Sequence, residues 1–353
     1  MFKHEISFGP LAISADAPVF LIAEGGVNHN GDLETAFRLI AEAKKAGAHA
    51  VKFQSFTADA LVSKGTPKVR HHVDPLHPEE THHDMIKRLE IDEDFQRQLF
   101  ARCVEEGILF LSTPYDVESA RFLDQLGVAA FKTASADIVD LPLHECIAQT
   151  KKLAFVSVGM ASMEEIAEVV DIYQRVGNPY LILLHCTSSY PASAPSLNLR
   201  VIPTLHERFG TLVGYSDHSI GNLAAGVSVA LGACVIEKHF TLDRQMEGPD
   251  HKASIEPAEF AELSRVLQQT RLVLGDGIKM TMPEEIDMKQ FSRKSLVSMR
   301  PISVGEVLGE KDVVLKRPGT GVAWKDRHTI IGKIAIHAIP ADTVIDIKDF
   351  ISS

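Results

Sequence analysis

The chain has 353 residues, of which 45% are hydrophobic and 24% charged, a composition typical of a soluble globular protein. Its formal net charge of -11 gives no support for nucleic-acid or membrane-surface binding as the main role. The N-terminal MFKHEISFGP lacks the apolar core of a signal peptide, and no apolar run reaches membrane-spanning length, so we expect a cytoplasmic protein without a membrane partner.

The first elements form a unit that recurs along the chain. Residues 5–13 predict a short hairpin with Gly9 and Pro10 at its turn. The apolar run 19–24 (VFLIAE) predicts a strand that ends at a carboxylate, Glu24. Asp32 is a suitable N-cap for a following helix that ends near Gly47.

Repetition of this unit predicts the fold class. We identify eight strands, at residues 19–24, 49–54, 108–113, 129–134, 153–158, 180–186, 212–216 and 233–239. Helical patterns separate or follow them at residues 92–106, 116–126, 162–176, 221–231 and 257–274. Eight strands alternating with helices over about 250 residues are typical of an α/β fold of the (β/α)8 TIM-barrel type. A doubly wound sheet is the alternative, but it usually has fewer strands, and no G-x-G-x-x-G follows the first strand.

Polar residues stand at the C-terminal ends of all eight predicted strands, where TIM barrels carry their chemistry. They are Glu24, Lys52, Gln54, Ser112, Thr113, Lys132, Ser135, Ser157, His185, Thr187, Ser188, Ser216, His218, Glu237 and His239. A barrel with a purely structural role would not need such groups on every strand.

The last two strands end in a repeated pattern, Ser216 with His218 and Glu237 with His239. Side chains two apart on a strand point to the same face, and the intervening helix makes the strands parallel neighbours. His218 and His239 therefore meet at one rim, where two imidazoles near carboxylates suit Mn, Fe or Zn. The alternative is that each histidine only hydrogen-bonds locally, and the repetition argues against it.

Two regions depart from the repeating unit. A long excursion at residues 55–91 carries His71, His72, His77, His82 and His83, whose spacing matches no standard metal motif. We interpret it as a solvated loop that covers the barrel mouth. Beyond a barrel domain at residues 1–278 and a polar linker at 279–290, short β-like runs predict a small β-rich domain at 291–353.

Ten motifs occur in a recognisable order: IAEGGVNHNGD, AVKFQSF, STPYD, KTASAD, SVGMAS, LLHCTSSYP, GYSDHS, IEKHFTLD, GPDH and KRPGTG. Together they resemble the sialic acid (nonulosonate) synthase family, which includes N-acetylneuraminate synthases, their legionaminate and pseudaminate relatives, and a spore-coat polysaccharide protein. The resemblance covers nearly the whole chain. Its C-terminal part resembles the antifreeze-like SAF (β-clip) domain of that family.

The resemblance implies a transferase of polysaccharide biosynthesis. It would condense phosphoenolpyruvate with an open-chain N-acetylated amino sugar, either N-acetylmannosamine or a 2,4-diacetamido-6-deoxy hexose, and release phosphate by C–O cleavage. The implied cofactor is a divalent metal, Mn²⁺ or alternatively Mg²⁺ or Co²⁺, held by His218 and His239 to polarise the sugar aldehyde. Glu24 is the implied base or electrostatic stabiliser near the attacking water.

The resemblance also implies two binding sets. Phosphoenolpyruvate would bind to cations and hydroxyls, namely Lys52, Thr113, Lys132, Ser135, Ser157, Ser188 and Ser216. The sugar would bind to Gln54, Tyr190, Glu237, Asp250, Arg317 and Phe291. Arg317 and Phe291 belong to the SAF domain, which in this family caps the partner subunit's barrel and so implies a domain-swapped homodimer. Ser188 stands where we expect an asparagine in relatives.

Other interpretations remain open on the residues alone. Lys52 and Lys132 could be buried lysines paired with Glu24 or Glu237. A class I aldolase would use Lys132 or Lys52 to form a Schiff base with a ketone substrate. A non-catalytic sugar-binding protein on the same scaffold is the third possibility, although such a protein would not need both histidines and both lysines.

Overall fold

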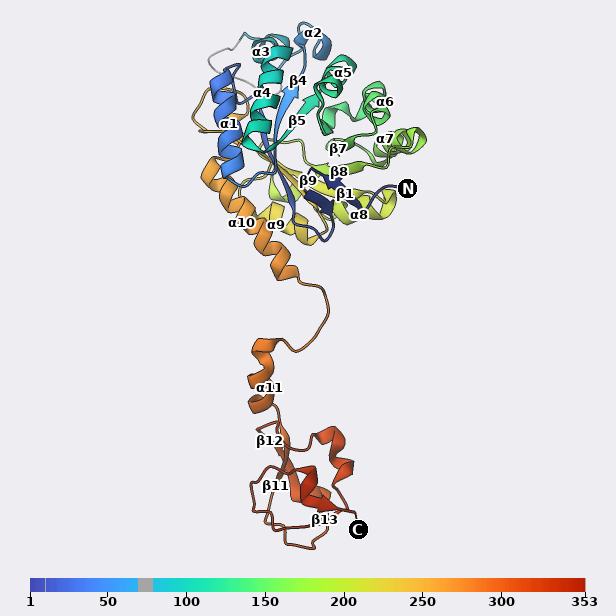
Figure 1. The fold of residues 1–353 in the computed structure, drawn as a ribbon, viewed down its shortest axis with the longest axis vertical. Helices are drawn as coiled ribbons and strands as arrows, with labels where there is room; N and C mark the ends of the chain where they lie inside the picture. Colours follow the sequence, from blue (N-terminus) through green and yellow to red (C-terminus); the bar gives the residue numbers. More distant parts are fainter. Residues whose placement is uncertain (10, 69–78, 353) are drawn as a thin grey trace. The chain divides into compact units, whose positions relative to one another are not determined.

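The computed structural model describes residues 1–9, 11–68 and 79–352, which form two compact units (Figure 1). The first unit spans Met1–Gly275 and the second Asp276–Ser353. Among the described residues, no helix is both long enough and apolar enough to cross a membrane.

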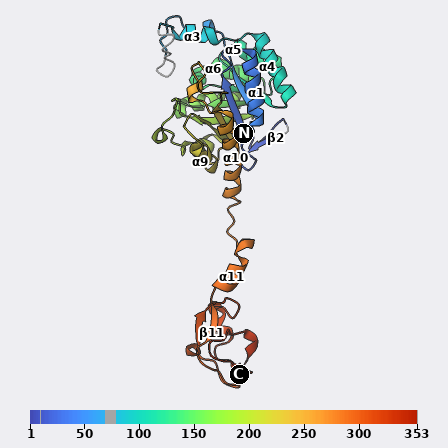
Figure 2. The same cartoon turned by 90° about the vertical axis from the view of Figure 1, so that its left-hand side faces the viewer.

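The first unit is a barrel of eight parallel strands surrounded by helices (Figures 1 and 2). The strands are β3 (Phe20–Gly26), β4 (Ala50–Ser55), β5 (Leu109–Pro114), β6 (Ala130–Thr133), β7 (Leu153–Ser157), β8 (Leu181–Cys186), β9 (Leu212–Asp217) and β10 (Val235–His239). Their hydrogen-bonded order is β5-β4-β3-β10-β9-β8-β7-β6, and the terminal strands β5 and β6 also lie side by side. The predicted TIM barrel is confirmed, and the doubly wound sheet is excluded.

The predicted helices also form, with ends that lie within about two residues of those predicted. The outer helices are α1 (Leu33–Lys45), α4 (Glu93–Glu106), α5 (Val117–Leu126), α6 (Leu141–Gln149), α7 (Met163–Val176), α8 (Val201–Phe209), α9 (Leu223–Ala230) and α10 (Pro257–Leu274). Asp32 caps α1 by accepting a 2.7 Å hydrogen bond from the Thr35 amide. Gly177 ends α7 at φ +73°, a left-handed conformation that suits glycine.

Alternation along the strands separates an apolar barrel interior from a polar mouth. Inward residues early in the strands, such as Phe20, Ile22 and Phe155, form one buried apolar cluster. The predicted hairpin, β1 (Glu5–Phe8) and β2 (Leu11–Ser14), adds Ile6, Phe8 and Ile13 to this cluster. Since side chains repeat every second residue, the next inward position on β3 after Ile22 is Glu24. The polar residues at the strand ends therefore rest on a packed apolar floor.

In the described part of the excursion at residues 55–91, the chain forms the helices α2 (Ala58–Leu61) and α3 (His82–Leu89). Thr81 and Asp84 form a reciprocal capping box at the start of α3. His83 contacts Asp59 with 3.1 Å between Nε2 and Oδ1. His71, His72 and His77 lie outside the described residues.

The second unit is built from two small antiparallel sheets. One pairs β11 (Ser295–Ser298) with β12 (Val313–Lys316), and the other pairs β13 (Ile334–Ala335) with β14 (Phe350–Ile351). The β-like run at 301–308 forms only single bridges, at Ile302 and Val307. Part of the predicted linker is helical, because α11 (Ile286–Ser292) begins within it.

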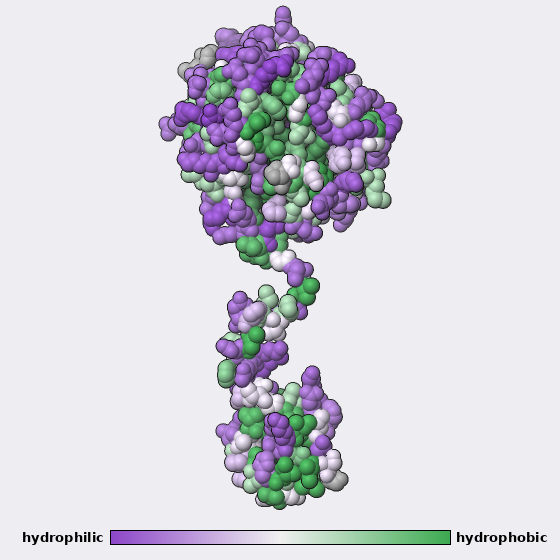
Figure 3. Space-filling view, viewed as in Figure 1, coloured by the Kyte–Doolittle hydropathy of each residue, from purple (hydrophilic) through white to green (hydrophobic). Residues whose placement is uncertain are grey.

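Hydrophobic residues reach the surface of the second unit, as Figure 3 shows for the face in view. Large apolar side chains with at least 45% exposure in residues 276–352 are Ile278, Met280, Met282, Ile286, Met288, Phe291, Met299, Val304, Val307, Trp324, Ile336, Ile347 and Ile351.

Candidate active site

A cavity of about 530 Å³ opens at the C-terminal ends of the barrel strands. Each of the eight strands contributes a side chain to its lining: Glu24, Lys52, Thr113, Lys132, Ser157, Cys186, Ser216 and Glu237. The other predicted barrel residues also line it, namely Gln54, Ser135, Ser188, Tyr190, His218, His239 and Asp250. The structure thus brings together all fourteen site residues predicted within the first unit. Arg317 and Phe291 belong to the second unit, where both are exposed.

Three strand-end residues do not line this cavity. Ser112 contacts Ser55, with 2.6 Å between the hydroxyl oxygens, and His185 Nε2 lies 2.7 Å from the Leu197 carbonyl oxygen. Thr187 donates to the Ser196 carbonyl at 3.2 Å. On a strand, a neighbour of an inward residue points outward, so standing at a strand end does not by itself place a side chain in the mouth.

The floor of the cavity is a network of two lysines and two carboxylates, all buried. Lys52 Nζ lies 2.6 Å from Glu24 Oε2 and 3.8 Å from Glu237 Oε2, and it donates to Thr113 at 3.0 Å. Lys132 Nζ lies 3.5 Å from Glu237 Oε1 and donates to Ser157 at 2.7 Å. The pairing of lysines with Glu24 and Glu237, raised as an alternative from the sequence, therefore exists within the cavity itself.

The network drives the two carboxylates toward opposite protonation behaviour. Burial raises the pKa of Glu24 to about 7, although Lys52 opposes this shift. Burial also disfavours the ionised form of Glu237, but Lys132 and Lys52 outweigh it and lower its pKa to about 2. Two carboxyls whose pKa values are pushed apart take different roles: Glu237 stays ionised, while Glu24 exchanges a proton near neutral pH.

Hydroxyl groups and a glycine form a small cradle beside Lys132. Ser135 accepts a 3.0 Å hydrogen bond from the Gly159 amide. A Cβ atom on Gly159 would lie 2.5 Å from Ser188 Oγ and 2.8 Å from Ser135 Oγ. Glycine at this position is what allows both hydroxyls to approach the backbone, a packing suited to a small anion.

The two histidines meet at the mouth with their ring centroids 5.3 Å apart. Tyr190 packs against both rings, at 4.1 Å from His218 and 5.5 Å from His239. His218 Nδ1 lies 2.9 Å from the Thr187 carbonyl oxygen; if Nδ1 donates, Nε2 is left as the lone-pair nitrogen. Burial and the neighbouring His218 lower the pKa of His239, which keeps its imidazole neutral. Neutral imidazoles are the form that binds metal.

The fit to a divalent metal rests on this histidine pair. His239 Nδ1 is buried without a hydrogen-bond partner and lies 4.0 Å from Asp250 Oδ2. Within residues 1–9, 11–68 and 79–352, no three His, Cys, Asp or Glu side chains converge closely enough to hold an ion. Of the described residues, His218 and His239 would be the two nitrogen ligands, and substrate or water oxygens would have to complete the coordination.

Several cavity residues were not singled out from the sequence. Asp137 follows Ser135 by two positions in KTASAD, and burial with nearby Asp140 raises its pKa to about 7. Cys186 lies 3.7 Å from His218 Nδ1. Both stand in motifs already quoted, so an extended strand-end inventory would have found them. The apolar residues that α2 and α3 place on the cavity carry no comparable signal.

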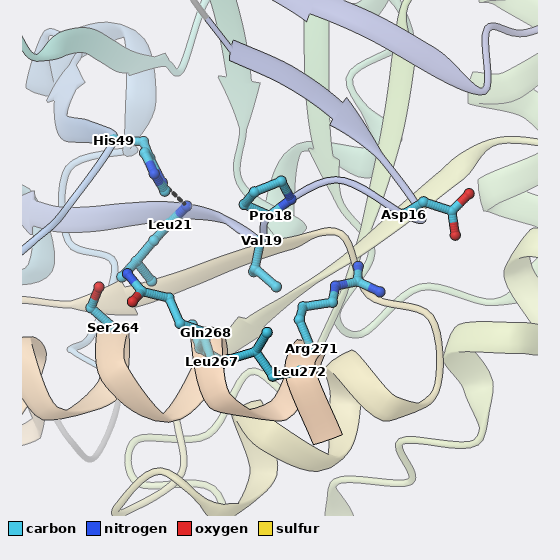
Figure 4. Close-up of a pocket in the computed structure, with 10 residues that line it drawn as sticks. All are labelled: Asp16, Pro18, Val19, Leu21, His49, Ser264, Leu267, Gln268, Arg271 and Leu272. Carbon is cyan, nitrogen blue, oxygen red and sulfur yellow. Dashed lines mark hydrogen bonds between the residues drawn. The ribbon is translucent and has the colours of Figure 1, made fainter. Parts of the chain in front are cut away.

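A second cavity of about 340 Å³ lies near the start of β3, against α10 (Figure 4). Val19, Leu21, Leu267 and Leu272 line it, and the ring of His49 points to the Leu21 amide, which donates to Nδ1 at 2.9 Å. The lining of this second cavity has no lysine paired with a hydroxyl, as Lys52 and Lys132 are in the first cavity. We therefore take the first cavity as the candidate active site.

Comparisons with known proteins identify the family of this chain. The NeuB family profile matches residues 39–279, and the SAF domain profile matches residues 293–351. The chain is 41% identical to the N,N'-diacetyllegionaminic acid synthase of Campylobacter jejuni, over 92% of this chain and 98% of that relative. It is 34% identical to the N-acetylneuraminate-9-phosphate synthase of Homo sapiens, over 94% and 93% of the two chains.

A solved structure gives the same result. The N-acetylneuraminic acid synthetase of Leptospira borgpetersenii in complex with citrate matches with a TM-score of 0.73 and 36% identity, covering 80% of this chain and 94% of that one. These relatives are nonulosonic acid synthases, as the ordered motifs predict. The chain belongs to the NeuB family and carries a C-terminal SAF domain.

Proposed function

We propose that this enzyme condenses phosphoenolpyruvate with the open-chain aldehyde form of an N-acetylated amino sugar, giving a nonulosonic acid and phosphate. One observation carries the proposal: two buried lysines and a hydroxyl cradle lie in the same cavity as a pair of imidazoles. The first group suits a phosphorylated carboxylate, and the second suits a metal that activates a carbonyl.

Phosphoenolpyruvate would bind across the ends of β4 to β9. Lys132, Ser157 and the Ser135–Gly159–Ser188 cradle supply a cation and donors for one anionic group. Lys52 and Thr113 supply a cation and a hydroxyl for the other anionic group of phosphoenolpyruvate. Ser216 now donates to Glu237 at 2.9 Å, so it would contact phosphoenolpyruvate only by turning its hydroxyl away from that carboxylate.

His218 and His239 would hold the divalent metal, with Mn²⁺ as our first choice. When bound, this ion would supply Lewis-acid polarisation of the aldehyde. Tyr190 keeps the two rings in place, and the Thr187 carbonyl orients His218. The remaining work falls to the chain's own groups, which bind, orient and move a proton.

In the reaction, C3 of phosphoenolpyruvate bonds to the aldehyde carbon, and the aldehyde oxygen takes up a proton to become a hydroxyl. Water then adds to C2 and loses a proton, for which Glu24 is the acceptor with a pKa near operating pH. Cleavage of the C2–O bond releases phosphate and leaves a keto group. Ionised Glu237 stabilises positive charge that develops at C2 while it holds both lysines.

Gln54, Tyr190, Asp250 and Glu237 would contact the sugar. Gln54 donates to Glu24 at 3.4 Å, and the Asp250 carboxylate faces His239, so both stand at the edge where the aldehyde enters. Glu237 is paired with the lysines on the cavity floor, so of these four residues it would have the least direct contact with the sugar.

We further propose a domain-swapped homodimer in which Arg317 and Phe291 reach the partner subunit's cavity. Phe291 is 60% exposed and stands among the exposed apolar side chains of the second unit, which supports a covered surface there. An arginine added to this cavity would neutralise part of the charge of the bound anions.

The direct test is phosphate release. We expect phosphate to form only when phosphoenolpyruvate, Mn²⁺ and an N-acetylated aldose are all present. Release without the aldose, or no release with any aldose of the family, would overturn the proposal.

An aldolase shares one feature with the site, because burial lowers the pKa of Lys132, as a Schiff-base lysine requires. Yet Lys132 is committed to Ser157, the Thr133 carbonyl and Glu237. Borohydride with pyruvate should therefore trap no adduct. A sugar-binding protein without catalysis is tested by calorimetry: we expect phosphoenolpyruvate to bind in the presence of Mn²⁺, and failure would revive this alternative.

A further inference from the structure

Two loops at the mouth are joined by a network of hydrogen bonds that the proposed reaction does not use directly. The first loop is residues 27–32, between β3 and α1. The second is residues 240–256, between β10 and α10, and it carries Asp250. We name the side chains that join them the loop clasp: Asn28, Asn30, Thr241, His251 and Ser254.

Asn28 forms the buried end of the loop clasp. Its Nδ2 donates to the Phe240 carbonyl at 2.9 Å and to Ser254 Oγ at 3.0 Å. Because a carbonyl can only accept, the contact with Phe240 fixes which end of the amide faces the second loop. Among the described residues, Asn28 Oδ1 has no hydrogen-bond partner although it is buried, which is costly for a polar atom. The side chain therefore serves this position through its two donors.

The loop clasp reaches Asp250 through Ser254. The Ser254 hydroxyl donates to the Asp250 carbonyl at 2.7 Å while it accepts from Asn28. Asn28 is 1% exposed and Ser254 2%, so water does not compete for either hydrogen bond. A continuous series of hydrogen bonds thus connects the first loop to the backbone of Asp250.

Asn30 and His251 hold the second loop at further points. Asn30 Nδ2 donates to the Glu247 carbonyl at 2.7 Å and lies 3.3 Å from His251 Nε2. Since the amide NH2 can only donate, Nε2 accepts, and the His251 proton sits on Nδ1, 2.7 Å from Thr241 Oγ1. Gly248 permits this close packing, because a Cβ there would lie 2.7 Å from the His251 ring. The second loop is therefore fixed both before and after its carboxylate.

The loop clasp bears on the sugar site, given the proposed function on which this step rests. Asp250 Oδ2 lies 4.0 Å from His239 Nδ1, at the edge where the aldose would enter. A carboxylate on a loop binds hydroxyls better when the loop is already ordered, because ordering it on binding would consume part of the binding energy. We propose that Asn28 and Asn30 are positioning residues that fix Asp250 for the aldose. The described lining of the cavity includes neither asparagine, so both act through the second loop.

The experiment measures phosphate release by the full-length protein with phosphoenolpyruvate and Mn²⁺. The aldose is whichever gives the faster rate, N-acetylmannosamine or a 2,4-diacetamido-6-deoxy hexose. Asn28→Ala should raise KM for the aldose roughly tenfold or more, since displacing a binding group by about 1 Å can cost on the order of 10²-fold. KM for phosphoenolpyruvate should stay near its wild-type value, because that substrate would lie at the lysines and the cradle. Asn30→Ala, at an exposed position, should act in the same direction with little loss of stability.

Asn178→Ala is the matched control. Asn178 is also 1% exposed, and its Nδ2 joins the α7–β8 connection to a neighbouring segment by donating to the Ala148 and Lys152 carbonyls. It does not line the cavity. This variant should lower the melting temperature, as Asn28→Ala does, and leave KM for the aldose unchanged.

Ser254→Ala tests the route from Asn28 to Asp250. It should raise KM for the aldose by itself. Adding it to Asn28→Ala should raise KM little further, because both changes break the same series of hydrogen bonds. Fully additive effects of the two changes would overturn this route.

An unchanged KM for the aldose in Asn28→Ala, or an equal rise in Asn178→Ala, would overturn this inference and leave the synthase proposal standing. If wild-type protein releases no phosphate with either aldose, the synthase proposal fails and this inference fails with it. If Asn28→Ala does not fold, Asn30→Ala decides the question by the same comparison of KM values.

Discussion

Asp217 and Lys238 form a buried ion pair directly behind the two mouth histidines, with 2.7 Å between Oδ2 and Nζ. Each residue immediately precedes a histidine, His218 or His239, so each points to the opposite face of the sheet. Lys238 also donates to the carbonyls of Ser219 and Gly221, at 2.6 and 3.1 Å. The pair thereby fixes the segment that carries His218 against the strand that carries His239.

Replacing Lys238 by methionine should both destabilise the barrel and weaken the metal site. The change leaves the Asp217 charge buried without its partner, which typically costs about 3–5 kcal/mol. Urea unfolding measures the loss, and Mn²⁺ titration of the folded variant measures the metal affinity. Lys45→Met is the control, since its ion pair with Glu42 is largely exposed and should change stability by less than about 1 kcal/mol. Unchanged Mn²⁺ affinity in Lys238→Met would show that the pair does not position the histidines.

The pH dependence should report Glu24. Its pKa of about 7 means that the ionised, proton-accepting form is populated above that pH, so the rate of phosphate release should rise with pH through about 7. Glu24→Gln should lower the rate by roughly 10²–10⁴-fold and remove this rise of the rate with pH. If the rate of the variant still rises with pH through about 7, another group is titrating. Asp137, with a pKa of about 7, is then the candidate for that group.

Gly159→Ala should impair phosphoenolpyruvate binding without unfolding the barrel. The new Cβ would displace the hydroxyls of Ser188 and Ser135, and overpacking of this kind costs about 1–3 kcal/mol. We expect KM for phosphoenolpyruvate to rise roughly tenfold or more, with the thermal melt by circular dichroism largely preserved. Gly226→Ala is the matched control, because its Cβ would meet Thr270 at an ordinary 3.5 Å. A wild-type KM in Gly159→Ala would exclude the cradle as the anion site.

Metal removal should abolish activity reversibly. EDTA is expected to stop phosphate release, and added Mn²⁺ to restore it, because a metal on His218 and His239 would supply the Lewis acid that activates the aldehyde. His239→Ala should lose turnover and weaken Mn²⁺ binding measured by titration. A variant that keeps near-wild-type rates at low Mn²⁺ would contradict the metal assignment.

The proposed domain swap predicts complementation between two defective proteins. Arg317→Ala should lower activity and leave the barrel folded, since Arg317 lies in the other unit. Mixing it with Glu24→Ala should restore part of the rate through hybrid dimers that hold one cavity with both residues intact. Mass spectrometry verifies that the subunits have exchanged. If activity still does not recover, the result counts against the swap.

Sequence reasoning succeeded where local rules determine position. Alternation along β3 and β10 fixed the direction of Glu24, Glu237 and His239, and caps such as Asp32 fixed the helix starts. It raised the pairing of the two lysines with Glu24 or Glu237 only as an alternative, without saying which lysine meets which carboxylate. Lys52 meets Glu24 on the adjacent strand β3, whereas Lys132 meets Glu237 from a strand far away in the chain.

It failed where the repeating unit is interrupted. The segment 55–91 was predicted to be a solvated loop over the mouth; its described part does line the cavity, but through the helices α2 and α3, and Met85 and Leu89 gave no sign that they would face inward. His185 was included among the strand-end groups, but its ring contacts the Leu197 carbonyl outside the cavity. The position of His185 at the end of its strand was predicted correctly, but the side of the sheet to which its ring points was not.

Oxygen labelling tests the central claim most directly. Phosphoenolpyruvate carrying ¹⁸O in the bridge between C2 and phosphorus should, on reaction with the aldose and Mn²⁺, give phosphate that contains the label. C–O cleavage after addition of water at C2 requires this result. Label retained in the organic product would mean that the P–O bond breaks, and it would contradict the proposed reaction.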